Sequence, residues 1–211
     1  MRHDGGVTTN KRRGPGRPSG NIHVVDREAL LDAAERVLAR DGSGASLEAI
    51  AEEAGVTKPI VYLRIGSRAE LSNALANRLA ERLVVAARPS VSSSRLDRDM
   101  LAAFCTITLQ TIAEHRELFL YVTRGNADDS AERALYLAAT SAQPLAVLLG
   151  RWREHQGLDP AVALPWAYGV IGMLNMVALW WLEEGDSPVE VVAGQLADLM
   201  WAGLRGNPTP N

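Results

Sequence analysis

The chain has 211 residues, of which 47% are hydrophobic and 5% aromatic, and its formal net charge at pH 7 is -3. This length is sufficient for a small domain joined to a larger one, each with a hydrophobic core. The single cysteine, Cys105, excludes an internal disulfide and is typical of a reducing cytoplasm. The first residues also lack the apolar run of a secretory signal, so we expect a cytoplasmic protein.

The charge is divided unevenly along the chain. Residues 1–80 hold 12 Lys or Arg and 10 Asp or Glu, a net charge of +2, whereas residues 81–211 hold 10 and 15, a net charge of -5. Phosphate binding depends on a local basic surface and not on the total charge. The negative total therefore does not exclude nucleic-acid binding by the N-terminal part.

Residues 1–25 carry basic side chains among Gly, Pro, Ser and Asn and have little periodic apolar content, which predicts a disordered basic arm. Within it, GPGRPSG (residues 14–20) is similar to the AT-hook, in which an arginine flanked by Gly and Pro enters the minor groove of A·T-rich DNA. Arg17 would be that arginine. A plain flexible tail, or one that only aids solubility, is the alternative.

The next segment predicts an amphipathic helix that begins at Asp26 and ends near Asp41 and Gly42. Its apolar residues recur at helical spacing: Leu30, Ala33, Ala34, Val37 and Leu38. This helix can supply the apolar face that the following short helices need for a core.

Residues 46–71, SLEAIAEEAGVTKPIVYLRIGSRAEL, predict two short helices separated by a turn at Gly55. Ser46 can cap the first helix and Thr57 the second, and Pro59 falls in the first turn of the second, where its missing N–H costs little. Gly66 ends that helix, and a capping box formed by Ser67 and Glu70 opens the next one. The segment is a helix-turn-helix whose second helix would enter the DNA major groove.

The order of the amphipathic helix, the two short helices with their turn, and the capped start of the next helix resembles the DNA-binding domain of the TetR family of transcriptional regulators. The resemblance extends over about residues 26–80. The resemblance implies that Thr57, Tyr62 and Arg68 contact phosphates. The family usually ends this helix with a segment such as Tyr-His-Phe, whereas here Leu63, Arg64 and Ile65 follow the tyrosine, which makes Arg64 a further candidate. The full set of expected DNA-contacting residues is Arg17, Ser46, Thr57, Lys58, Pro59, Tyr62, Arg64 and Arg68.

After Arg88 a short Pro- and Ser-containing linker precedes a second set of helices, expected at residues 101–115, 116–124, 130–156 with a kink at Pro144, 159–184 and 187–204. We find no convincing strand. The predicted fold is all-α, with about nine helices: a three-helix helix-turn-helix DNA-binding domain at residues 26–88 and a larger helical ligand-binding and dimerisation domain at residues 95–205.

The last two predicted helices are apolar around most of their circumference, which indicates that a partner covers part of them. Their large apolar residues are Val177, Trp180, Trp181, Val191, Val192, Leu196, Leu199, Met200 and Trp201. The family resemblance implies a homodimer through these helices on a palindromic site. Closure of the monomer core is the alternative, and a membrane span at residues 161–182 is a third, disfavoured by Pro165 and by the acidic residues that follow.

By the same resemblance, a small-molecule inducer would lie inside the second domain. Candidate lining residues combine apolar walls with a few polar groups, and they are Phe104, Thr108, Tyr136, Gln143, Trp152, Trp166, Tyr168 and Asn175. For each of them an ordinary core position is the alternative. Because few charges point inward, we expect a neutral, largely apolar ligand.

The sequence shows no metal-ligand spacing, nucleophile elbow or phosphate-binding glycine loop, so an enzyme, a metal site and a cofactor are not expected. The function predicted is that of a sequence-specific repressor that leaves a palindromic operator when it binds its ligand. A DNA-bound architectural protein without an inducer is the alternative.

Overall fold

A computed structural model describes residues 25–91, 96–124 and 130–205. Within these ranges the chain forms nine α-helices and one 3-10 helix, and no described residue lies in a strand. The predicted all-α fold, with an N-terminal helix-turn-helix and a larger helical C-terminal part, is confirmed. The elements are α1 (Arg27–Asp41), α2 (Leu47–Glu53), α3 (Lys58–Ile65), α4 (Arg68–Val91), α5 (Arg98–Glu114), α6 (Arg116–Arg124), α7 (Ser130–His155), η1 (Pro160–Val162), α8 (Ala163–Glu184) and α9 (Val189–Arg205).

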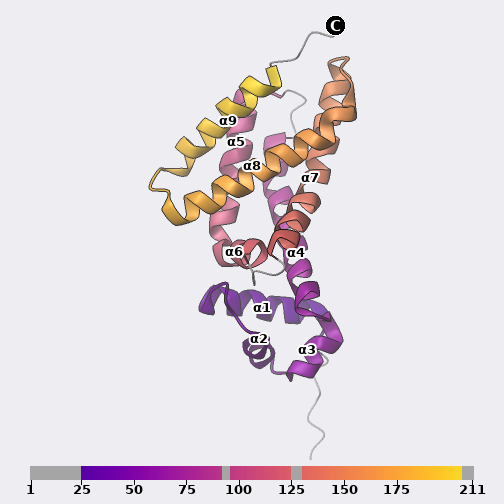
Figure 1. Ribbon diagram of the computed structural model, residues 1–211, viewed down its shortest axis with the longest axis vertical. Helices are drawn as coiled ribbons and strands as arrows, with labels where there is room; N and C mark the ends of the chain where they lie inside the picture. The colour runs from indigo at the N-terminus through magenta and orange to yellow at the C-terminus, as the bar shows by residue number, and fades with distance from the viewer. Residues whose placement is uncertain (1–24, 92–95, 125–129, 206–211) are drawn as a thin grey trace, which may run out of the picture.

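Helices α1–α3 form a small unit at one end of the molecule, which we call the head (Figure 1). The carboxylate of Asp26 accepts a hydrogen bond of 2.8 Å from the amide of Ala29 and so caps α1. The buried faces of the three helices join in one apolar cluster, to which Leu38, Ile50 and Val61 contribute. The short helices α2 and α3 are thus stabilised mainly by burial against α1.

Helix α4 runs from the head into the remaining helices, which form the body (α5–α9), as Figure 1 shows. It packs against α1 and against α5, α6 and α7. The sequence predicted a linker after Arg88, but the helix continues through Pro89 to Val91. Burial of Leu83 and Ala87 just before the proline explains why α4 continues there. The division into domains at residues 26–88 and 95–205 stays a prediction.

A cluster of charged groups ties α4 to α1. The Arg78 guanidinium donates hydrogen bonds to Asp32 at 2.7 Å, to Glu35 at 3.1 Å and to Glu28 at 2.5 Å. Arg82 adds a bond of 2.7 Å to Glu35. Only 17% of the Arg78 side chain is exposed, so these bonds lie in a partly desolvated site and join the two helices firmly.

In the body, α8 packs along α7 and α9 packs along α5 (Figure 1). Cys105, Leu109 and Ile112 of α5 are fully buried among apolar neighbours from these helices. Helix α9 contributes Val192, Leu196 and Met200 to the same core. Part of the apolar surface predicted for the last two helices is therefore covered within one chain.

Candidate DNA-binding surface and ligand cavity

The turn between α2 and α3 has the geometry of a helix-turn-helix. The Ser46 hydroxyl accepts a bond of 3.1 Å from the amide of Ala49 and caps α2. Gly55 has φ +66°, a left-handed conformation that favours glycine, and it directs the chain into α3. Ser46 and Gly55 thus take the local roles that the sequence predicted for them.

Helix α3 presents one face to the core and the other to solvent. Val61 and Ile65 are buried. On the outer face Tyr62 is 46% exposed and Leu63 is 75% exposed, the highest value for a large hydrophobic side chain in the described ranges. Arg64 is exposed on the same helix. The sequence analysis did not select Leu63, although a leucine next to Tyr62 and Arg64 on a surface helix was the available signal.

Two residues at the start of α3, Thr57 and Pro59, are exposed to solvent. Thr57 occupies the N-cap position, but its side chain makes no capping hydrogen bond and the residue is exposed. Pro59 lies in the first turn and is also exposed. The Thr57 hydroxyl can therefore donate to a phosphate oxygen, as expected from the resemblance.

Lys58 is held by an acidic neighbour. Its ammonium group forms an ion pair and a hydrogen bond with the Glu48 carboxylate of α2 and lies 6.0 Å from the centre of the Tyr62 ring. The hydrogen bond between them raises the pKa of Lys58 and lowers that of Glu48. Lys58 stays charged, but a phosphate would have to compete with Glu48 for it.

Arg68 is the first residue of α4, and its side chain contacts residues outside α3. Its guanidinium donates to the backbone carbonyl of Ala45 at 3.4 Å and lies 6.0 Å from the ring centre of Tyr121 on α6. In this arrangement Arg68 connects the head to the body. Arg17 lies outside the described residues.

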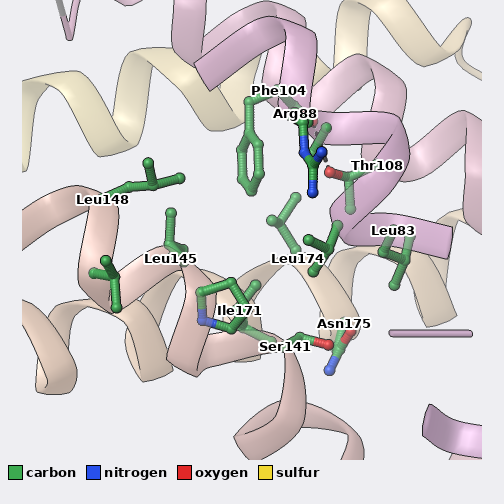
Figure 2. A pocket seen from close by; sticks show the side chains of 14 residues that line it. Leu83, Arg88, Phe104, Thr108, Ser141, Leu145, Leu148, Ile171, Leu174 and Asn175 are labelled. Carbon is green, nitrogen blue, oxygen red and sulfur yellow. Dashed lines mark hydrogen bonds between the residues drawn. The ribbon is translucent and has the colours of Figure 1, made fainter. Parts of the chain in front are cut away.

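The body contains a cavity of about 380 Å³ between α4, α5, α7 and α8 (Figure 2). Three of the predicted ligand residues, Phe104, Thr108 and Asn175, line it. The remaining lining residues are Leu83, Val84, Ala87 and Arg88 of α4, Ser141, Pro144, Leu145, Val147 and Leu148 of α7, and Ile171 and Leu174 of α8. Its size and apolar walls are those of a small-molecule site.

Five predicted ligand residues lie outside this lining. The Tyr136 hydroxyl donates to the Asn77 amide oxygen at 3.1 Å, and Gln143 is exposed. Trp166 lies below the Arg153 guanidinium, at 4.6 Å from the ring centre. Trp152 and Tyr168 are half-buried elsewhere on α7 and α8.

Two lining residues that the sequence analysis did not select are Arg88 and Ser141. Arg88 falls at the predicted end of a helix, where nothing in the pattern indicates an inward side chain. Ser141 stands one helical turn from Leu137 and Leu145, so its place on an apolar face was visible in the sequence. Arg88 brings a positive charge to a site expected to be neutral.

The described ranges contain no group of His, Cys, Asp or Glu side chains arranged to hold a metal ion. The Cys105 thiol is buried, which raises its pKa to about 12. One described segment, Pro160–Glu184, is long and apolar enough to span a membrane, with a mean hydropathy of 1.6 over its best window, of which 28% is buried. This property is shared by core helices of soluble proteins and is weak evidence for a membrane span.

Residues 30–75 match the model of the bacterial regulatory proteins of the tetR family. The chain is 25% identical to an uncharacterized HTH-type transcriptional regulator of Mycobacterium tuberculosis over 189 residues, which cover 87% of this chain and 80% of that one. It is 24% identical to the HTH-type transcriptional activator FasR of Mycolicibacterium smegmatis, with 96% of each chain covered. Both relatives are named as transcriptional regulators and not as enzymes.

The fold is similar to the crystal structure of the transcriptional regulator FadR from Bacillus subtilis in complex with stearoyl-CoA. The TM-score is 0.61 at 17% identity, and the match covers 83% of this chain and 98% of FadR. The matched segment, residues 30–75, contains α2, the turn and α3, which are the parts of the helix-turn-helix described above. Motif, structure and relatives thus agree that residues 30–75 form a helix-turn-helix of the tetR family of bacterial regulatory proteins, in a chain whose relatives are transcriptional regulators.

Proposed function

We propose that this protein is a homodimeric repressor that binds a palindromic operator and releases it when a small, largely apolar ligand enters the body. The observation that carries the proposal is the course of α4. This helix begins at Arg68, directly after the exposed helix α3, and its other end lines the cavity through Leu83, Ala87 and Arg88. A ligand that moves α4 would therefore also move the head.

The outer face of α3 would enter the major groove. Tyr62, Leu63 and Arg64 are exposed there without a covering element in the described chain, and Thr57 and Lys58 stand at the start of the helix. Aromatic, apolar and basic side chains on one short helix suit contacts with phosphates and base edges. Arg17 and the basic residues of the arm would add contacts to an adjacent minor groove, so removal of residues 1–20 should weaken binding.

The homodimer would form through α8 and α9. Met176 and Trp180 of α8 are 66% and 49% exposed, and Val191 and Leu199 of α9 are 47% and 63% exposed. Large apolar side chains that one chain leaves uncovered on adjacent helices are typical of a subunit interface. A symmetric dimer would present two α3 helices to an inverted repeat.

The cavity supports a ligand-controlled regulator over the architectural alternative. FadR of Bacillus subtilis was solved with stearoyl-CoA, so this fold can bind a ligand with a long apolar chain. A site between α4, α5, α7 and α8 has no use in a protein that only bends or covers DNA. We therefore place the protein in the cytoplasm as a sensor of an apolar metabolite.

The test is selection of bound sequences from a random DNA pool, followed by release of the selected DNA with a panel of apolar compounds. An inverted repeat that the full chain binds, and that a compound releases, would support the proposal. Enrichment without any sequence preference would contradict it. A compound that strengthens binding would overturn the repressor mode, and the relative FasR is named as a transcriptional activator.

A further inference from the structure

The cavity is apolar except for a few polar groups, and these groups lie on two sides of it. Figure 2 shows Arg88 and Thr108 on one side, and Ser141 and Asn175 on the opposite side. The Thr108 hydroxyl already donates to the backbone carbonyl of Phe104 at 2.7 Å. Arg88, Ser141 and Asn175 are therefore the groups that a ligand can use.

Ser141 is the more enclosed of these groups. The residue is 7% exposed, and its hydroxyl oxygen is buried without a hydrogen-bond partner. A buried hydroxyl without a partner destabilises the folded protein, and such groups in proteins are normally satisfied. Ser141 lines the cavity beside the amide-bearing Asn175, so a polar atom of a bound ligand would satisfy the hydroxyl.

Arg88 supplies the charge on the other side. Its guanidinium is directed between Phe104 and Thr108 in Figure 2. The lining residues include no Asp or Glu, and none of the described ion pairs involves Arg88. A positive charge at the edge of an apolar cavity attracts an anionic group whose apolar remainder fills the space.

We propose that the ligand is an oxygenated amphipathic acid. Its apolar chain fills the cavity, its anionic end binds Arg88, and a hydroxyl or carbonyl oxygen along the chain hydrogen-bonds with Ser141 and Asn175. This inference rests on the proposed function, because it concerns the ligand of the same site, and it replaces the neutral ligand expected from the sequence. The anion is a free carboxylate or the phosphates of an acyl carrier, and both bind a guanidinium in the same way.

The test compares probes with the same ten-carbon chain by titration calorimetry on the full chain. The probes are decanol, decanoate, decanoyl-CoA and a series of hydroxydecanoates in which the hydroxyl position is varied. We expect decanoate or decanoyl-CoA to bind at least about tenfold more tightly than decanol, and one hydroxydecanoate to bind more tightly still, by about fivefold. The stronger binder of the first two identifies the source of the anion.

Variants at Arg88 and Ser141 test the two polar contacts of the ligand independently. Arg88→Gln should bring the affinity of the anionic probes down to that of decanol, and Arg88→Lys should restore part of it. Ser141→Ala should abolish the gain from the hydroxyl, so that no hydroxydecanoate binds this variant more tightly than decanoate does. Arg151→Gln, at an exposed position on α7 outside the cavity, is the matched control. It should change neither the affinity for the anionic probes nor the gain from the hydroxyl. Circular dichroism and thermal unfolding confirm that each variant is folded.

Equal binding of decanol and both anionic probes, or full retention of anion binding in Arg88→Gln, would overturn the assignment of the anionic end. Absence of a hydroxydecanoate that binds more tightly than decanoate would overturn the role of Ser141. The proposed function fails in a different way, namely if the probes bind to the protein but leave its complex with the selected DNA unchanged.

Discussion

The backbone amide of Ser43, in the loop after α1, donates a hydrogen bond of 3.0 Å to the carboxylate of Glu117 at the start of α6. Arg116 bonds to the other oxygen of the same carboxylate at 2.5 Å and holds it in place. Together with the contact of Arg68 and Tyr121, this bond joins the head to a body helix that packs on both α4 and α7. A displacement of α6 would therefore be transmitted directly to α1.

Replacement of Glu117 by alanine should weaken the link between ligand and DNA binding. We expect Glu117→Ala to bind the selected DNA within about threefold of the wild type, but to lose much of the effect of the ligand, since coupling energies of this kind are about 1–3 kcal/mol. Fluorescence anisotropy with and without decanoate measures both quantities. Glu114→Ala, at the exposed end of α5, is the control, and a wild-type response of Glu117→Ala would rule out the connection.

Removal of the carboxylate that holds Lys58 should strengthen DNA binding. In Glu48→Gln the ammonium group is free to pair with a phosphate, so we expect affinity to rise by up to about fivefold and the slope of log affinity against log salt to steepen by about one. Glu52→Gln removes a like charge from the same helix and controls for the change in net charge. Equal slopes for the two variants would show that Lys58 does not reach the DNA.

Leu63 should read a thymine methyl group. Because the side chain is largely exposed, Leu63→Ala should leave the free energy of unfolding unchanged. It should weaken binding to the operator by about 1 kcal/mol, because the contact with one A·T pair is lost. Uracil in place of the thymine removes the same methyl contact, so the variant should be insensitive to that replacement whereas the wild type is not. Binding measurements on uracil-substituted operators test this. If the losses caused by Leu63→Ala and by uracil add up in the combined complex, the predicted contact is contradicted.

Charges on the exposed apolar residues of α8 and α9 should separate the subunits. The double variant Trp180→Glu and Leu199→Glu places two carboxylates where we propose the dimer interface, and we expect a folded monomer that binds the full operator at least about tenfold more weakly. Light scattering after size exclusion gives the mass. Val85→Glu, on an exposed part of α4, should leave the dimer intact. A dimeric double variant would move the interface elsewhere.

Loss of Arg78 should destabilise the junction of α1 and α4. Arg78→Met leaves Glu28, Asp32 and Glu35 without their common partner, and we expect the free energy of unfolding to fall by about 2 kcal/mol. Urea unfolding followed by circular dichroism measures the change. Arg151→Met makes the same replacement at an exposed site and should change stability by less than about 0.5 kcal/mol.

The helix-turn-helix was predictable because its signals are local. Ser46 caps α2, Gly55 takes a positive φ, and the Ser67 amide donates to the Glu70 carboxylate at 2.6 Å in the predicted capping box. Each of these depends on residues a few positions apart. The resemblance gave Arg68 a phosphate contact, which stays a prediction. Local signals could not indicate its contact with Tyr121, because the two residues are 53 positions apart.

The cavity was only partly predictable because its walls depend on how four helices pack. Phe104 and Thr108 lie one turn apart and share a face, and both line the cavity; their contact with a ligand stays a prediction. Trp166 and Tyr136 have the right chemistry, but they lie against Arg153 and Asn77 instead. Arg88 was expected at the end of a helix, just before a linker, and nothing local indicated that it would line a cavity; in the structure α4 continues to Val91 and Arg88 is among the lining residues.

The burial of Cys105 has a practical consequence for measuring the motion of the heads. Thiol reagents attack the thiolate, and this buried thiol, with its pKa near 12, stays protonated at neutral pH. A cysteine introduced at the exposed position Ala69 would therefore be the single reactive thiol in each chain. Spin labels attached there would report the separation of the two heads in a homodimer, with and without ligand, in an otherwise native protein.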